Sequence, residues 1–207
     1  MIAMPLEIVQ VPAGEMENFS YLVYCPASGR GIAVDPSLAP EKLLATAAER
    51  NIVLEVLVNT HGHRDHIAGN DRIIEATGAR LAAHPADVPR ADIPLTEGTF
   101  ITIGEERVEI LHTPGHTPGS IVLHPSGALI TGDTLFVTRV GRADLPGSDP
   151  EELYRSLRRL AEFPPDTRVY PGHDYGPRPV STIGFERENN PYLQCPDLDS
   201  FIRLRMG

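Results

Sequence analysis

The stretch Thr60-His61-Gly62-His63-Arg64-Asp65-His66 decides how the rest of this chain is interpreted. Three histidines and one aspartate lie within six consecutive positions, directly after the apolar run Ile52–Val58. Neutral imidazole and carboxylate are the usual protein ligands of zinc and iron. A hydrophobic core gains nothing from so many polar side chains in a row. The stretch therefore predicts a metal-binding loop, and a solvated turn is the alternative.

Three later places repeat the pattern of an apolar run followed by a potential ligand. Val108–Leu111 precedes His116, Leu129–Thr131 precedes Asp133, and Arg168–Tyr170 precedes His173. Loops held by rigid strands can fix a coordination geometry. The full inventory is five histidines and two aspartates: His61, His63, Asp65, His66, His116, Asp133 and His173. That set exceeds one tetrahedral ion and suits two ions that share a carboxylate, for which Asp133 is the natural candidate.

The order of elements indicates an α/β (α+β) chain with two mixed sheets and helices outside them. Strands are expected at Leu6–Val11, Tyr21–Tyr24, Gly31–Val34, Leu54–Asn59, Arg80–Ala83, Phe100–Ile103, Arg107–His112, Ile121–His124, Ala128–Thr131 and Thr167–Tyr170. Helices are expected at Pro40–Asn51, at Asn70–Thr77, from Asp149 to about Phe163, and at Ser181–Asn190 with Ser181 as its cap. We expect residues 1–207 to form a single domain.

Composition limits the classes of partner. The formal charge is -10, from 28 acidic and 18 basic residues, which argues against nucleic acid and against anionic membrane surfaces. Cys25 and Cys195 are the only cysteines and lie outside any C-x-x-C pair, which fits a reducing compartment. No signal peptide or membrane-spanning run is visible. We therefore expect a cytoplasmic protein with a small-molecule substrate, and a homo-oligomer is compatible with the sequence.

The metal-ligand motifs resemble those of the metallo-β-lactamase superfamily. Thr60–His66, Gly115-His116, Gly132-Asp133 and Gly172-His173 match its motifs in order, over roughly residues 20–175. The resemblance implies a four-layer αβ/βα sandwich with the metals at one sheet edge. It also implies a first metal bound by His61, His63 and His116, a second bound by Asp65, His66 and His173, and Asp133 as the bridge. Histidine at position 63, in place of glutamate, argues against the di-iron flavoprotein branch.

Two segments narrow the choice of branch within the superfamily. Val140–Ser148 is similar to a segment of both glyoxalase II-like thioester hydrolases and persulfide dioxygenases. Tyr170–Tyr175, followed by Ser181-Thr-Ile and Asn190-Pro, is similar to persulfide dioxygenases, whereas short glyoxalase II-like proteins share the Thr-Ile-Gly and Asn-Pro but usually differ after the histidine. Arg142 is a candidate for orienting an anionic substrate or a neighbouring carboxylate. The alternative is that it pins its own loop through Asp144 or Asp149. Tyr175 is a candidate donor to a bound substrate, and the alternative is that it only packs over the metal loop.

The leading hypothesis is a glyoxalase II-like metal-dependent hydrolase of a thioester or related small acyl compound. A metal-bound hydroxide would attack the carbonyl, and Asp65 would orient or deprotonate the water. Two divalent ions are expected, with zinc preferred and iron or manganese compatible. The residues after Asn190 are too few for the helical domain that grips glutathione in full-length glyoxalase II, so the carrier thiol stays open.

Two alternatives remain beside this hypothesis. One is an iron-dependent persulfide dioxygenase, in which a single iron uses His61, His116 and Asp133. The other is a non-catalytic metal-binding module. The remaining histidines are expected to be surface or structural groups rather than ligands: His84, His112 and His124.

Overall fold

The first half of the chain forms one mixed sheet. The structure is a computed structural model that describes residues 5–207. Six strands pair in sequence order: β1 (Glu7–Pro12), β2 (Phe19–Tyr24), β3 (Arg30–Val34), β4 (Val53–Val58), β5 (Arg80–Ala83) and β6 (Ile93–Pro94). The first three strands are antiparallel, whereas β3 to β6 run parallel. The parallel order brings the carboxyl ends of β3 and β4 to the same edge of the sheet.

The second half forms another mixed sheet, in the order β14-β13-β10-β9-β8-β7. Its strands are β7 (Phe100–Ile103), β8 (Glu106–His112), β9 (Ile121–His124), β10 (Ala128–Gly132), β13 (Arg168–Pro171) and β14 (Ser181–Thr182). Strands β10 and β13 are parallel neighbours and the other pairs are antiparallel. A small hairpin, β11 (Leu135–Phe136) with β12 (Arg139–Val140), follows β10.

Alternating side chains in β2 show how the two sheets pack. Phe19, Tyr21 and Val23 belong to the apolar cluster that joins the sheets, which also contains Ile101 and Ile110. Leu22 and Tyr24, on the opposite face, belong to the cluster under the first helices. Successive residues of a strand point to opposite faces, so a fully buried strand must be covered on both sides. The sheets therefore lie face to face in the middle of the molecule.

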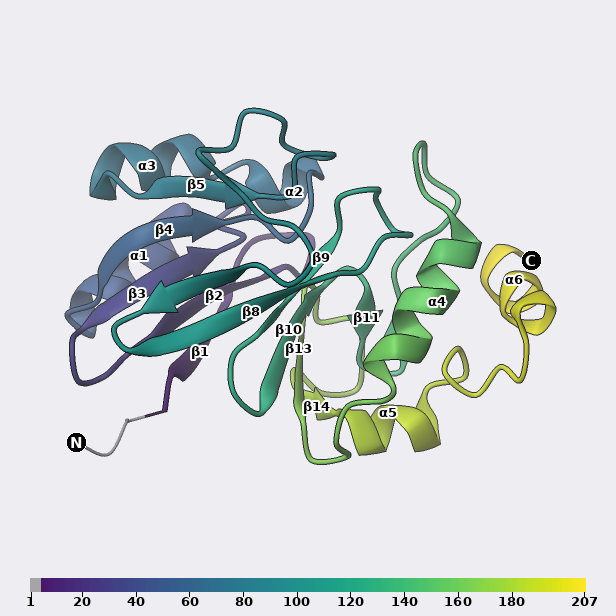
Figure 1. Cartoon of the computed structure of the whole chain (residues 1–207). Coiled ribbons are helices and arrows are strands. Elements are labelled where there is room, and N and C mark those ends of the chain that lie inside the picture. Colours follow the sequence, from purple (N-terminus) through teal and green to yellow (C-terminus); the bar gives the residue numbers. More distant parts are fainter. Residues whose placement is uncertain (1–4) are drawn as a thin grey trace.

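Helices cover the two outer faces (Figure 1). Helices α1 (Pro40–Glu49) and α3 (Asn70–Thr77) bury Leu43 and Ile73 against the first sheet. Helices α4 (Pro150–Leu160) and α5 (Ile183–Asn189) pack on the second sheet, and α6 (Leu198–Met206) packs against α4. The result is the expected four-layer αβ/βα sandwich of two mixed sheets flanked by helices.

The prediction for the C-terminal segment was wrong in two respects. The helix expected at residues 181–190 covers Ile183–Asn189, and its cap is Thr182, whose hydroxyl accepts from the Phe185 amide at 3.2 Å. Ser181 lies in β14, and its hydroxyl donates to the buried Glu186 carboxylate. Helix α6 was not predicted. Its apolar pattern is too short and weak to predict a helix, because Phe201 is its single buried residue. The helix is stabilised by its contacts with α4.

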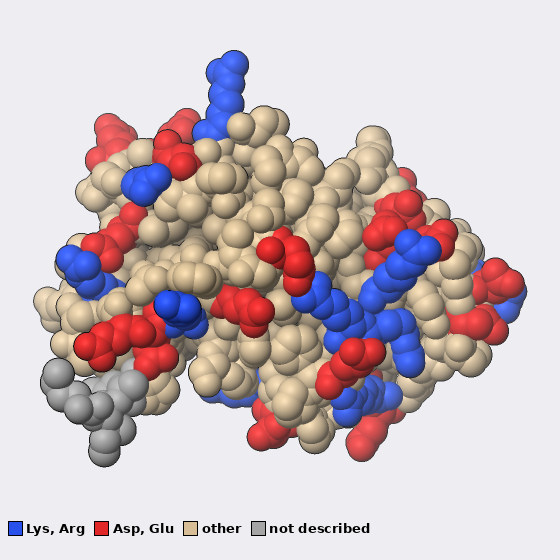
Figure 2. All heavy atoms as spheres, in the orientation of Figure 1, with Lys and Arg blue, Asp and Glu red and all other residues tan. Residues whose placement is uncertain are grey.

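The surface carries mixed charge. Acidic and basic side chains are interspersed over the face in Figure 2, and several form pairs, such as Arg159 with Glu97. Within residues 5–207, no helix is long and apolar enough to cross a membrane.

Candidate metal centre

Strand ends position the seven predicted ligands in one place. His61 and His63 follow β4, and α2 (Arg64–Ile67) begins directly after His63. The loops after the other three strands contribute one residue each, namely His116 after β8, Asp133 after β10 and His173 after β13. Because β10 and β13 are adjacent and parallel, Asp133 and His173 leave the sheet at the same edge.

The seven residues divide into two groups of three around Asp133. In the first group, ligand atoms of His61, His63 and His116 all lie within 4.8 Å of one another. The same holds for Asp65, His66 and His173 in the second group. The seven residues expected from the sequence are thus gathered around one point.

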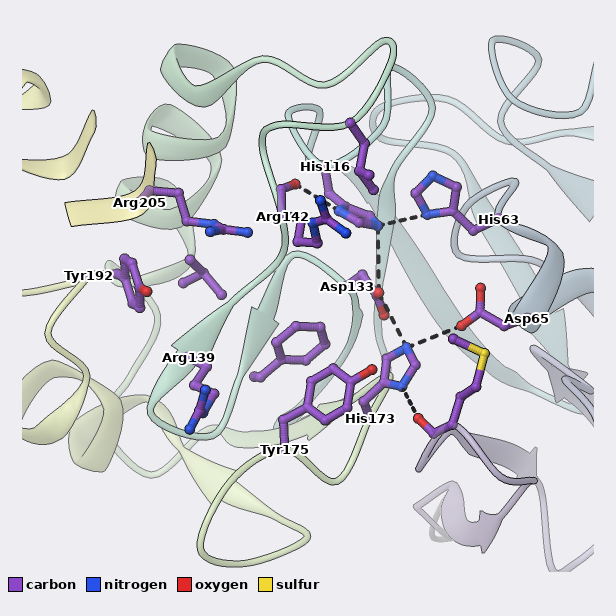
Figure 3. Close-up of a pocket in the computed structure, with 14 residues that line it drawn as sticks. His63, Asp65, His116, Asp133, Arg139, Arg142, His173, Tyr175, Tyr192 and Arg205 are labelled. Carbon is purple, nitrogen blue, oxygen red and sulfur yellow. Dashed lines mark hydrogen bonds and ion pairs between the residues drawn. The ribbon is translucent and has the colours of Figure 1, made fainter. Parts of the chain in front are cut away.

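The Asp133 carboxylate lies between the two groups. Its oxygens are 3.5 Å from His116 Nε2 and 3.4 Å from His173 Nε2 (Figure 3). They also lie 3.2 Å from His66 Nε2. Gly172 makes this approach possible, because a Cβ there would lie 2.3 Å from Asp133 Oδ1. The carboxylate therefore has the position of the bridging ligand that the resemblance implies.

Oxygen atoms fix the tautomers of two rings directly. The Nδ1 atom of His116 donates to the carbonyl of Arg142 at 2.9 Å. The Nδ1 atom of His173 donates to the carbonyl of Met16 at 2.8 Å. A carbonyl can only accept, so both Nδ1 atoms carry hydrogen, and in the neutral rings both Nε2 lone pairs face the cluster.

Asp35 fixes two more rings. Its Oδ2 atom accepts from His66 Nδ1 at 3.0 Å and from the Thr60 hydroxyl at 2.6 Å. The Thr60 hydroxyl therefore accepts from His61 Nδ1, 3.1 Å away. Asp35, His61 and His66 also satisfy the spacing of a metal group. However, the Asp35 oxygens are already filled by Thr60 and His66, so Asp35 supports the ligands instead of competing with them.

The arrangement fits metal ions. In the neutral form of these rings the four inward Nε2 atoms carry no hydrogen, and His63 Nδ1 lies 2.9 Å from His116 Nε2. Within residues 5–207, His61 Nε2 and Asp133 Oδ1 are buried without a hydrogen-bond partner. Buried polar atoms are almost always satisfied. Cations in the middle of the cluster would satisfy these atoms and separate the facing lone pairs.

Burial and charge shift the pKa values of these groups in different directions. Burial lowers the pKa of His61 well below its usual value. Burial alone would also lower the pKa of His66, but Asp133 and Asp35 outweigh it and raise that pKa. Burial would raise the pKa of Asp133, but His66 and His173 hold it well below its ordinary value. The cluster therefore keeps its carboxylate ionised, as a metal bridge requires.

Sequence reasoning missed two residues of the site. Asn18 precedes β2, and its amide donates to Asp65 Oδ2 at 3.0 Å. No local pattern around Asn18 indicates this role. Asp35 follows β3 directly and is buried, so the strand-end pattern used for the other ligands would have found it.

A cavity of about 370 Å³ opens over the cluster. In Figure 3 the candidate ligands that line the cavity, His63, Asp65, His116, Asp133 and His173, lie on one side, and Arg139, Tyr192 and Arg205 lie on the other. Arg205 comes from α6 and is held by the carbonyl of Gly141 at 2.8 Å. Among the described residues that line the cavity, the only acidic ones are the candidate ligands Asp65 and Asp133.

The two predicted substrate residues both line this cavity. Arg142 forms two hydrogen bonds with Asp144, at 2.9 and 2.8 Å, so it does pin its own loop. Asp149 does not take part, because it caps α4. Tyr175 stacks on His173 with ring centroids 4.5 Å apart, and its hydroxyl points toward the ligand cluster. Burial raises the pKa of Tyr175 to about 12, so this hydroxyl stays protonated.

The fold and the site together define a metallohydrolase-type centre at the strand ends of an αβ/βα sandwich. Residues 13–173 match the family model of the metallo-beta-lactamase superfamily. This protein therefore belongs to the metallo-β-lactamase superfamily.

Curated relatives narrow the class further. Over 178 residues the chain is 42% identical to a hydroxyacylglutathione hydrolase of Cereibacter sphaeroides, an alignment that covers 83% of this chain and 68% of the relative. A hydroxyacylglutathione hydrolase of Polaromonas is 42% identical over 166 residues, which are 76% of this chain and 62% of that protein. The chain thus spans about two thirds of these relatives. They confirm the predicted class, a glyoxalase II-like metallo-β-lactamase-fold hydrolase.

A solved structure shows the same fold over almost the whole chain. ETHE1 from Myxococcus xanthus superimposes with a TM-score of 0.92 at 31% identity, covering 97% of this chain and 90% of that one. This likeness fits the predicted resemblance to the persulfide dioxygenase branch of the superfamily.

Proposed function

We propose that this protein hydrolyses the thioester between a small acyl group and an anionic thiol carrier, using two divalent ions held by the seven residues around Asp133. The observation that carries the proposal is the pair of three-ligand groups that share one carboxylate at the floor of an open cavity. Two divalent ions bound there would polarise the thioester carbonyl and lower the pKa of water. Zinc is the proposed metal, although iron and manganese accept the same donors.

Asp65 is the proposed group that orients the attacking water and accepts its proton. Burial would raise the pKa of Asp65, but His173 and His66 lower it, so the side chain is ionised. Its Oδ2 atom is bound by Asn18 at 3.0 Å and lies 3.4 Å from His173 Nε2. Oδ1 therefore remains available to a water in the cavity that Asp65 lines.

The cationic wall of the cavity supports an anionic carrier. Arg139, Arg142 and Arg205 all line the cavity, although the chain as a whole is acidic. Asp144 neutralises Arg142, whereas Arg139 has no ion pair within the described residues. A thiol carrier with a terminal carboxylate would place that charge among these arginines. The proposed function of Tyr175 is to donate its hydroxyl to the bound acyl group.

The first substrate to test is a hydroxyacyl-glutathione thioester, which the names of the relatives indicate. Hydrolysis would be followed by the loss of thioester absorbance, with metal content measured on the same preparation. We expect turnover with two ions per chain, loss of turnover after chelation, and recovery when zinc is restored. Full activity of a metal-free preparation would contradict the proposal.

The second candidate function is an iron-dependent persulfide dioxygenase. The close structural likeness to ETHE1 favours it, and its single iron would use His61, His116 and Asp133. It predicts one iron per chain and oxygen uptake with a glutathione persulfide. A two-zinc protein that consumes no oxygen would exclude it. Inertness of metal-loaded protein toward thioesters, lactones and persulfides would favour the third alternative, a non-catalytic metal-binding module.

Two further properties belong to the same proposal. We treat residues 1–207 as a single domain because one apolar cluster contains side chains from both sheets. We place the protein in the cytoplasm, since its two cysteines are free and buried. A homo-oligomer is compatible with the sequence.

A further inference from the structure

A carboxylate outside the ligand set joins two of the loops that carry ligands. Asp87 lies in the connection between β5 and β6, and its Oδ2 atom accepts from the Gly62 amide at 2.8 Å. The same oxygen accepts from the Thr117 hydroxyl at 2.6 Å. Its Oδ1 atom accepts from the Gly119 amide at 2.7 Å. One side chain therefore connects the loop of His61 and His63 with the loop of His116.

The local geometry is built around this carboxylate. A Cβ at Gly119 would lie 2.6 Å from Asp87 Oδ1, so only glycine lets that loop approach so closely. The Thr117 hydroxyl is also 2.7 Å from the Ser120 hydroxyl, which accepts from the Thr117 amide at 3.1 Å. Asp87 thus completes a hydrogen-bonded turn directly after His116.

The first ligand group depends on Asp87 more than the second group does. Within the described residues, no carbonyl or carboxylate holds the ring of His63. The position of His63 therefore depends on the adjacent backbone at Gly62, whose amide Asp87 binds. Asp35, in contrast, supports His66 directly and His61 through Thr60. Asp87 contacts no residue of the second group.

We propose that Asp87 is a positioning residue that sets the first metal group, His61, His63 and His116, by locking its two loops together. The proposal rests on the metal site of the proposed function, but it is independent of the thioester substrate. Removing outer partners of metal ligands typically weakens metal binding by about 10- to 100-fold. We expect Asp87→Ala to weaken the first ion by about that factor and to leave the second unchanged.

The test measures zinc affinity by competition with a chromophoric chelator in two single-group backgrounds. His173→Ala keeps the first group intact, and His116→Ala keeps the second. In the His173→Ala background, adding Asp87→Ala should weaken zinc binding by about 10-fold or more. In the His116→Ala background the same change should alter the affinity less than about twofold. Equal weakening in both backgrounds, or no weakening in either, would overturn the proposal.

Two further variants separate positioning from folding. Asp87→Asn keeps an oxygen for some of the three donors, so its zinc affinity should lie between those of Asp87→Ala and the unchanged residue, even where the alanine variant does not fold. Asp92→Asn is the matched control, because Asp92 lies in the same connection and, within the described residues, its carboxylate accepts only from the Leu81 amide, at 2.9 Å. The Asp92 variant should bind zinc normally. If the unsubstituted protein binds no metal, the proposed function fails. If the unsubstituted protein binds zinc and the Asp87 variants bind it with the same affinity, the positioning role fails and the proposed function stands.

Discussion

His66 and His173 face each other through their Nε2 atoms at 3.1 Å, although they are 107 residues apart in the chain. Neither ring can turn away, because Asp35 holds Nδ1 of His66 and the Met16 carbonyl holds Nδ1 of His173. Two lone pairs directed at one point are unfavourable unless a proton or a cation lies between them. The site is therefore held open for a cation by its outer hydrogen bonds.

Replacing Asp133 tests the bridge. Asp133→Ala should abolish stable binding of both ions and turnover, because both groups lose their shared carboxylate. Metal per chain after gel filtration and thioester hydrolysis are the measurements. Asp166→Asn removes an exposed carboxylate and serves as the control, with normal metal content expected. Two tightly bound ions in the Asp133 variant would refute the bridging role.

Metal removal should lower thermal stability. An ion that binds only the folded chain stabilises it by about 2.7 kcal/mol at a free concentration 100 times its dissociation constant. Chelation should therefore lower the melting temperature, and added zinc should restore it in a concentration-dependent manner. Scanning calorimetry of the same preparation, with and without chelator, measures this. Identical melting temperatures would argue against metal binding by the folded state.

Asp35 should be important for stability even without metal. Asp35→Asn turns one acceptor oxygen into a donor, which then faces a hydrogen of Thr60 or His66 in a buried place. An unsatisfied buried polar group costs about 1–3 kcal/mol. Urea unfolding of the metal-free protein measures the loss. Glu55→Gln, which removes an exposed partner of Arg30, should change stability by less than about 0.5 kcal/mol. A neutral effect of Asp35→Asn would contradict the role of Asp35 inferred here.

Arg139 should affect substrate binding more than chemistry. Arg139→Ala should raise KM for an anionic glutathione thioester by about two- to fivefold, with kcat nearly unchanged, because one exposed charge contact is lost. A neutral acyl thioester should show no change in KM. Arg155→Ala is the matched control, since Arg155 pairs with Glu152 on α4 outside the cavity. An equal effect on both substrates would remove the argument for an anionic carrier.

Local patterns were sufficient for much of this protein. Apolar runs with β-branched residues predict strands, and the candidate ligands lie in the loops directly after them. The sequence therefore predicts the strand ends that precede His61, His116, Asp133 and His173. The four-layer fold followed from the order of these runs and from the motif resemblance. The C-terminal segment was harder, because the short helix α6 gains its stability from contact with α4 and not from its own periodicity.

The sequence by itself determined two mixed sheets with helices outside and the seven residues that gather at the strand ends, since these depend on residue type and local spacing. The resemblance of its motifs implied the family and the four-layer order. Only the tertiary structure decided which imidazole nitrogen faces inward, because that depends on acceptors far away in the chain, such as the Met16 carbonyl for His173. It likewise decided the parts played by Asn18, Asp35, Asp87 and Arg205. Each of these acts through a contact across elements that no spacing along the chain records.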